Sequence, residues 1–260
     1  MAEITTERIK ELRDRTSVSI MQCKKALEET DGNIEEAVLV LRKISAEIAA
    51  KKADRLSADG CIAVANTTTK AALVVLHSET DFVAQNAEFI KAVEALAQEA
   101  LQNGVESTRE AAKKRAEELV LTLGENIIPG EAVVIAGEQV GTYLHHNRKA
   151  GALVAINGGS EELAKDLATH IAAMNPLYKS ENDIPKEERE KIVAFFEKEA
   201  LESDKPADIQ AKMLQGKVKG YLSEQTLLEQ SFFKNPQQTV AQALESAGAS
   251  VIDFVRIKLG

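Results

Sequence analysis

The sequence predicts an α+β protein that begins with a small helical module. Apolar residues recur at helical spacing through residues 4–44, and short apolar runs typical of strands alternate with amphipathic segments after residue 59. Two long helical segments with proline near each start interrupt the second half of the chain. We therefore expect a three-helix N-terminal module, a core of two related α/β subdomains, and an inserted antiparallel helical hairpin.

The N-terminal module is predicted to span residues 1–45. Ser19 is followed three residues later by Gln22, which is the pattern of a capping box at the start of a second helix. Asn33 is a suitable cap for a third helix, whose apolar positions share one face. Residues 46–58 are rich in Ala, Lys and Asp, and we interpret them as a helical or flexible linker.

The first core subdomain is predicted to span residues 59–140. Its second apolar run, Ala71–His77, does not alternate with polar residues, so we expect a strand that is covered on both faces. Thr108 is expected to cap the second helix of this subdomain at its start. The predicted elements are strands Cys61–Ala65 and Ala71–His77 and helices Ala87–Leu101 and Arg109–Leu123.

The second core subdomain, residues 141–260, is predicted to repeat this order of elements about 80 residues further along the chain. The residue identities of the two blocks barely match, so the relation rests on the order of elements. The predicted elements are strands Gly141–Leu144 and Ala152–Ile156, helix Glu161–Ala173, helix Thr239–Ser246 and strand Val251–Leu259.

The inserted hairpin is predicted within residues 181–223. Its helices, Pro185–Glu202 and Pro206–Leu222, are separated by the short turn Ser203–Lys205, so we expect them to lie antiparallel and to protrude from the core. The seam between them is predicted to contain Ile192, Phe195, Phe196, Ile209, Met213, Leu214 and Val218.

The composition argues against several classes of protein. The chain has 32 Lys and Arg against 41 Asp and Glu, and it has no Trp, so direct binding of nucleic acid is not expected. No apolar run approaches the roughly 18 residues of a membrane helix, and we expect no membrane association. Without a secretory signal, Cys23 and Cys61 are expected to stay reduced in a cytoplasmic protein.

The sequence also lacks the usual signatures of catalysis. It contains no phosphate-binding loop, dinucleotide fingerprint, hydrolase motif or zinc-protease motif. His145 and His146 are adjacent in a predicted turn, where exposed side chains are the favoured interpretation. We therefore expect no catalytic residue, no metal site and no cofactor. The alternative, a small-molecule enzyme that uses His145 or His146, predicts a pocket that converges on these side chains.

One connector has an unusual composition. Ser78–Ala84 follows a buried strand and precedes a helix, where polar residues are usual, yet it places Phe82 and Val83 beside Asp81. Two interpretations stay open at this point. Either Phe82 packs beneath the following helix, or its side chain is exposed for contact with a partner.

The segment Thr80-Asp81-Phe82-Val83 resembles a signature of the bacterial elongation factor Ts family. A second segment, Leu12–Thr16 continuing through Cys23–Leu27, resembles the N-terminal signature of the same family. The two segments occur in the family's order and at its separation, and the resemblance extends over nearly the whole chain. It implies a UBA-like fold for the N-terminal module.

The resemblance implies a translation elongation factor that acts as the guanine nucleotide exchange factor for elongation factor Tu. Such a factor binds the GDP-bound partner, displaces Mg²⁺ with an intruding loop, releases GDP and stays on the nucleotide-free partner until GTP binds. The exchange residues that it implies are Thr80, Asp81, Phe82 and Val83. The further positions that match partner contacts are Arg13, Ile20, Met21 and His145.

An alternative function is a protein–protein adaptor that docks through the helical module without changing nucleotide affinity. That alternative predicts that Asp81 and Phe82 are dispensable for the effect on the partner. The sequence leaves open a monomer, a homodimer or a complex with two copies of each protein. It also leaves open whether the hairpin is a spacer, a dimer contact or a second partner site.

Overall fold

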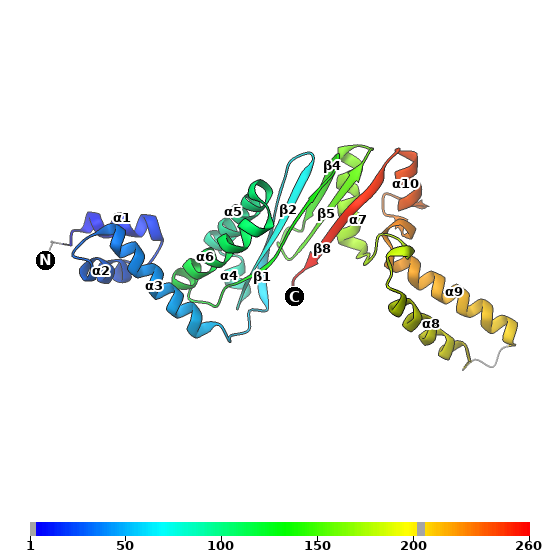
Figure 1. Ribbon diagram of the computed structural model, residues 1–260, viewed down its shortest axis with the longest axis horizontal. Coiled ribbons are helices and arrows are strands. Elements are labelled where there is room, and N and C mark those ends of the chain that lie inside the picture. Colours follow the sequence, from blue (N-terminus) through cyan, green and yellow to red (C-terminus); the bar gives the residue numbers. More distant parts are fainter. Residues whose placement is uncertain (1–3, 202–205) are drawn as a thin grey trace.

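The computed structural model of the chain describes residues 4–201 and 206–260, and it confirms a mixed α+β fold (Figure 1). A helical module lies at one end of an elongated molecule, sheets with covering helices form the middle, and a helical hairpin projects from the other end. Among the described helices, none is both long enough and apolar enough to cross a membrane.

The N-terminal module consists of helices packed around one apolar cluster. The side chains of Thr5, Ser19 and Asn33 accept hydrogen bonds from backbone N–H groups at the three helix starts. The predicted capping box is half formed. The Gln22 N–H donates to the Ser19 hydroxyl oxygen, but the Gln22 side chain accepts from the Ser19 hydroxyl, at 2.7 Å, instead of from the Ser19 backbone N–H. The helices are α1 (Thr6–Thr16), α2 (Ile20–Glu29) and α3 (Ile34–Lys52).

The third helix continues beyond the predicted end of the module and packs against α6 (Val105–Leu123) of the core. At this contact the buried Ser45 hydroxyl donates a hydrogen bond to the carbonyl of Glu117. Residues 46–52 of the predicted linker are therefore helical, and only residues 53–58 separate α3 from the first strand. The predicted division of the chain into units stays a prediction.

The first sheet has three antiparallel strands in the order β1-β2-β3. Helices α5 and α6 cover its outer face, where Phe89, Leu96 and Leu119 are buried. The predicted N-cap at Thr108 is wrong, because Gly104 ends α5 at a φ of 87° and α6 begins directly after it. The strand β3 is not among the elements predicted from the sequence. The elements are β1 (Asp59–Asn66), β2 (Lys70–Ser78), α4 (Asp81–Ala84), α5 (Ala87–Asn103) and β3 (Ile128–Ala136).

The second sheet repeats this arrangement, with its strands in the order β4-β5-β8. In each sheet a third strand returns antiparallel to the second strand of a hairpin, which supports the predicted relation between the two subdomains. The inner faces of the sheets meet through Leu73, Val75, Leu153 and Ala155, so β2 is buried on both faces as predicted. The elements are β4 (Gln139–Leu144), β5 (Ala150–Asn157), α7 (Glu161–Met174), α10 (Val240–Ser246) and β8 (Ser250–Lys258).

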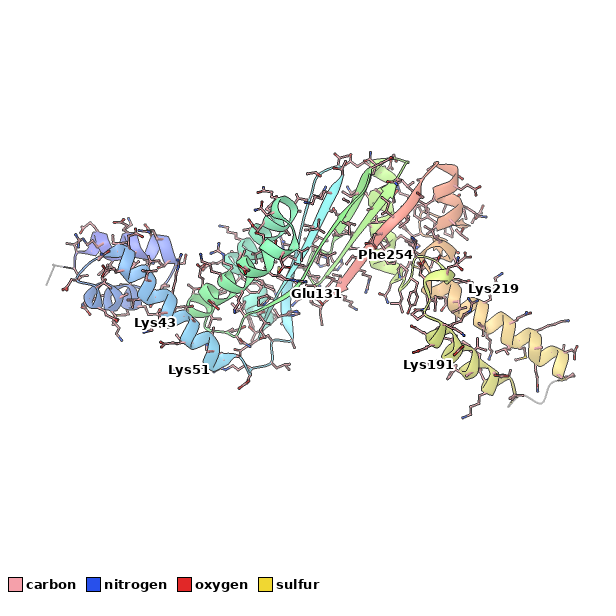
Figure 2. All side chains as sticks on the ribbon, viewed as in Figure 1. Lys43, Lys51, Glu131, Lys191, Lys219 and Phe254 are labelled. Atoms are coloured by element: carbon pink, nitrogen blue, oxygen red, sulfur yellow. The ribbon has the colours of Figure 1, made fainter. Side chains whose placement is uncertain are left out.

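The inserted hairpin consists of α8 (Lys186–Leu201) and α9 (Ala207–Gln225), and the predicted turn Ser203–Lys205 lies outside the described residues. Phe196 contacts Tyr221 across the two helices, with ring centroids 5.7 Å apart. The prediction that Phe195 lies in the seam is wrong, because this side chain is 69% exposed. Lys191 and Lys219 project from the two helices into solvent (Figure 2).

A buried histidine of α7, His170, contacts the segment that follows α9 at the base of the hairpin. His170 Nε2 lies 2.9 Å from Gln230 Oε1, and the backbone N–H of Phe233 donates to His170 Nδ1 at 3.4 Å. The Gln230 amide in turn donates to the carbonyl of Glu224 at 2.6 Å. Burial lowers the pKa of His170, and the bond to Gln230 opposes this shift only in part.

This histidine predicts a dependence of stability on pH. Because its pKa is lower in the folded chain than the ordinary value of 6.5, the unfolded chain binds more protons below that pH. We therefore expect the free energy of unfolding to fall as the pH decreases from neutral through about 6.5, with a contribution from His170 of at most about 1.4 kcal/mol per pH unit.

Urea unfolding at several pH values measures this contribution. His170→Gln should lower the stability at neutral pH and flatten its dependence on pH. His146→Gln, at an exposed position, is the matched control and should keep the slope of the parent chain. An equal slope in the parent chain and in His170→Gln would contradict the prediction.

Candidate functional site

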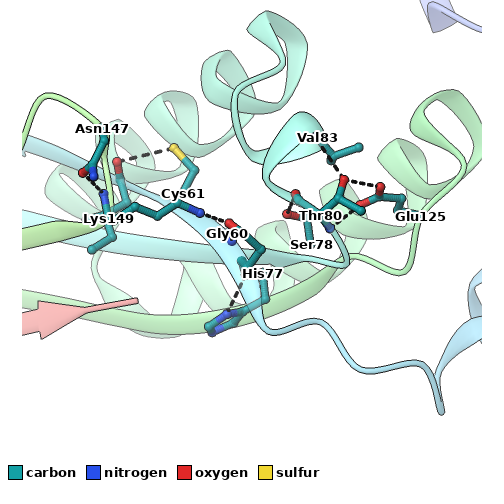
Figure 3. Close-up of polar contacts among 11 residues, drawn as sticks. Gly60, Cys61, His77, Ser78, Thr80, Val83, Glu125, Asn147 and Lys149 are labelled. Atoms are coloured by element: carbon teal, nitrogen blue, oxygen red, sulfur yellow. Dashed lines mark hydrogen bonds and ion pairs between the residues drawn. The ribbon is translucent and has the colours of Figure 1, made fainter. Parts of the chain in front are cut away.

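The unusual connector forms a one-turn helix at the end of β2. Thr80 is the N-cap of α4, and its hydroxyl oxygen accepts a hydrogen bond from the Val83 N–H at 3.4 Å (Figure 3). The buried Ser78 hydroxyl donates to the Thr80 carbonyl at 2.9 Å, which fixes the chain just before the cap. Ala84 is buried against the core, so α4 is held at both ends.

Phe82 lies on the outer side of this short helix, and 83% of its surface is exposed. The interpretation that Phe82 packs beneath the following helix is therefore wrong. Asp81, in the first turn of α4, is also exposed, whereas Val83 is half-buried against the core. A large apolar side chain held in solvent beside a carboxylate is typical of a contact surface for another protein.

One residue that contacts this helix has no recognisable signal in the sequence. Glu125 lies between α6 and β3, and its carboxylate accepts hydrogen bonds from both the backbone N–H and the hydroxyl of Thr80, at 3.0 Å and 2.5 Å. The two residues are 45 positions apart in the chain. No local pattern in the sequence joins them, and only the pairing of β2 with β3 brings them together.

The predicted contact residues of the N-terminal module lie apart from α4. Ile20 and Met21 occupy the first turn of α2 and are 55% and 64% exposed, and Arg13 is exposed on α1. This module lies at the end of the molecule beyond α5 and α6 (Figure 1). The structure therefore places these side chains on a surface separate from Phe82.

His145 lies at a third place, in the turn between β4 and β5. It is half-buried, and the Tyr143 hydroxyl lies 2.8 Å from its Nδ1. His145 lines an open cavity of about 440 Å³, together with Lys149, Arg256 and Lys258, and the described residues that line it include no carboxylate. The residues that line the cavity include His145 but not His146. Lys149 forms an ion pair with Asp59, so Arg256 and Lys258 supply the positive charge that suits an acidic surface or segment.

The described residues form no cluster of metal ligands, and burial raises the pKa of both cysteine thiols. Within residues 4–201 and 206–260, no group of three or more His, Cys, Asp or Glu side chains is arranged to hold a metal ion. Both cysteines are buried, and burial raises the pKa of the Cys61 thiol to about 11. Burial is also the main cause that raises the pKa of Cys23, so neither thiol forms the reactive anion near neutral pH.

Comparison with known proteins identifies the family. A sequence profile described as Elongation factor TS matches residues 79–260, which include the capped helix α4, the last strand of the first sheet and the whole second sheet. The chain belongs to the elongation factor Ts family. Proteins of this family are translation elongation factors, and the predicted resemblance is confirmed.

Bacterial relatives extend the similarity to the whole chain. Elongation factor Ts of Hahella chejuensis is 41% identical over 273 aligned positions, which cover 100% of this chain and 93% of the relative. Elongation factor Ts of Marinobacter nauticus is 40% identical over 269 positions, with 100% and 92% covered. Elongation factor Ts of Cellvibrio japonicus is 40% identical over 266 positions, again with 100% and 92% covered.

Proposed function

We propose that this elongation factor Ts family member is the guanine nucleotide exchange factor for elongation factor Tu, and that α4 is its exchange element. Family membership supports the role in translation and the choice of partner. The observation that carries the site assignment is the exposed Phe82 beside Asp81 on a helix that is fixed at both ends.

In the proposed mechanism, α4 inserts beside the nucleotide site of the GDP-bound partner. Burial of Phe82 in a partner pocket supplies about 1.5–3 kcal/mol. Mg²⁺ requires near-ideal octahedral ligation, and in the partner few protein groups hold it together with the phosphates. A small displacement of these ligands therefore weakens the binding of Mg²⁺. The Asp81 carboxylate acts in the same direction, because it places a negative charge near phosphate oxygens.

Exchange of this kind needs no catalytic group and no cofactor in this chain. Each 1.4 kcal/mol directed against bound GDP weakens its binding by about tenfold. Because the coupling between two ligands is reciprocal, GDP weakens the grip of this chain on the partner by the same factor. The nucleotide-free complex is therefore the tight one, and GTP binding dissociates it.

Two further surfaces are proposed to hold the partner while α4 acts. The exposed apolar pair Ile20 and Met21, with Arg13 nearby, offers the N-terminal module as a docking surface. His145 and the positively charged cavity beside it offer another surface, which suits an acidic region of the partner. The same apolar pair also supports the second candidate function, an adaptor that binds without releasing nucleotide.

A homodimer, or a complex with two copies of each protein, is proposed through the hairpin. Phe195, Leu201 and Tyr221 expose apolar surface on α8 and α9, which is typical of an interface. Analytical ultracentrifugation of the chain, alone and with elongation factor Tu, separates these assemblies from a monomer and a one-to-one complex.

Stopped-flow release of a fluorescent GDP analogue from elongation factor Tu tests the proposed function. We expect this chain to accelerate release strongly over buffer, and Asp81→Ala to reduce the acceleration by about fivefold or more. Asp208→Ala, an exposed aspartate on the hairpin, is the matched control and should retain the full rate. Binding without acceleration would favour the adaptor function.

A further inference from the structure

Two glutamates join the exchange helix to the turn that precedes β3. Glu79 and Thr80 lie side by side at the end of β2, and Glu125 and Asn126 lie side by side between α6 and β3. Glu125 accepts from the Thr80 N–H at 3.0 Å, while Glu79 accepts from the Asn126 N–H at 2.6 Å. Each segment therefore supplies one carboxylate and one backbone N–H to the other.

The bonds of Glu125 also determine how Thr80 caps the helix. The Thr80 hydroxyl donates its proton to Glu125 Oε1 at 2.5 Å, which leaves its oxygen lone pairs free to accept from the Val83 N–H (Figure 3). A hydroxyl that donates in one fixed direction is confined to one side-chain rotamer. The carboxylate thus orients the cap, and the cap orients the one-turn helix that carries Phe82.

The segment between α3 and β1 also holds this turn in place. The buried side chain of Asn126 donates to the carbonyl of Arg55 at 2.9 Å, and the Ser57 hydroxyl donates to the carbonyl of Asn126 at 3.0 Å. The Arg55 guanidinium lies 3.4 Å from Glu79. The Asn126 N–H, followed by the Arg55 charge, holds the pKa of Glu79 below its usual range, so this carboxylate is ionised at neutral pH.

We infer that Glu125 is a positioning residue for nucleotide exchange, which acts through Thr80 on the orientation of α4. This inference rests on the proposed function, because it assigns to Glu125 the task of presenting Phe82 and Asp81 in one fixed direction. A helix of one turn has too few internal hydrogen bonds to keep its own orientation, so it depends on such contacts. The Glu125 carboxylate on the opposite segment supplies hydrogen bonds that further turns would supply in a longer helix.

Three variants of the full chain test this role. Glu125→Ala removes both acceptors of Thr80. Glu125→Gln keeps the shape and one acceptor oxygen, so it should restore part of the function. Glu110→Ala removes an exposed carboxylate from α6 and is the matched control.

The first readout uses the chain alone and is independent of the proposed function. Amide hydrogen exchange at Thr80 and Val83 should become about tenfold faster or more in Glu125→Ala, because the Thr80 N–H loses its charged acceptor and the Thr80 hydroxyl that accepts from the Val83 N–H is no longer held in place. Glu110→Ala should leave both rates unchanged. Unchanged protection in Glu125→Ala would overturn the inference that this carboxylate orients the cap.

The second readout is the release of fluorescent GDP from elongation factor Tu at increasing concentrations of each variant. We expect Glu125→Ala to lower the rate at saturation by about tenfold, with the half-saturating concentration changed by less than about threefold, since the docking surfaces are intact. Glu125→Gln should lie between Glu125→Ala and the parent chain.

The outcomes separate this inference from the proposed function. If the parent chain does not accelerate GDP release, the proposed function is wrong, whatever the result of amide exchange. If the parent chain accelerates release and Glu125→Ala matches it within about twofold at saturation, the positioning role is wrong and the proposed function stands. A loss confined to the half-saturating concentration would also overturn the positioning role, because it would indicate a docking contact.

Discussion

Replacing Phe82 with alanine is expected to slow the GDP release that the chain promotes by about tenfold to a hundredfold, which is the kinetic equivalent of losing about 1.5–3 kcal/mol of apolar burial in the partner. The folded chain itself should be unaffected. Because 83% of the Phe82 surface is exposed, the substitution removes little packing, and the free energy of unfolding should change by less than about 0.5 kcal/mol.

Stopped-flow release of GDP and urea unfolding measure the two sides of this prediction. Leu177→Ala is a matched control, since this apolar side chain is also exposed but lies between α7 and α8, outside the surfaces proposed to contact a partner. Full acceleration by Phe82→Ala would keep the family assignment and remove Phe82 from the exchange element. A large loss of stability in the same variant would instead show that Phe82 packs within the core.

Replacing Gly141 with alanine is expected to have the largest effect on stability, a loss of about 3 kcal/mol or more. A Cβ atom at this position in β4 would lie 1.8 Å from the carbonyl oxygen of Ala164 and 2.2 Å from its carbonyl carbon. These atoms belong to the backbone of α7, so no side-chain rotation relieves the overlap. Either the helix moves away from the sheet or the strand pairing of β4 with β5 breaks.

Chemical denaturation with circular dichroism measures this loss. Gly216→Ala, in the exposed middle of α9, is the matched control, because a Cβ atom there meets nothing within 4 Å. Alanine is the better helix former, so the control should be unchanged or about 0.5–1 kcal/mol more stable. A Gly141→Ala chain as stable as its parent would mean that α7 and β4 are less closely packed than the structure describes.

The sequence predicted the elements that have a clear pattern of burial. Residues 71–76 of the predicted strand Ala71–His77 are all apolar, and such a run is typical of a strand that is covered on both faces. The strand β3 escaped prediction because it is only partly buried, with exposed residues at both ends and no regular alternation. Thr108 was misassigned as a cap because the helix start depends on Gly104, whose backbone conformation the sequence alone does not reveal.

The candidate site was predictable only in part for a similar reason. An apolar residue in a connector is compatible with burial and with exposure, so the sequence left Phe82 undecided until the structure placed it in solvent. The contact of Glu125 with Thr80 arises from strand pairing between distant segments. Periodicity and capping rules describe neighbours along the chain, and they carry no information about such a pair.

Because α3 runs unbroken from the N-terminal module to the core, its length determines how the two are oriented relative to each other. Its 19 residues extend roughly 28 Å from the module to the core, where Lys52 donates to the Gly124 carbonyl. One residue inserted into this rod would turn the module by about 100° and carry Ile20 and Met21 to another side of the molecule. The length of α3 thus determines the orientation of the module's exposed surface relative to the core. Natural insertions or deletions in this helix should therefore be close to whole turns.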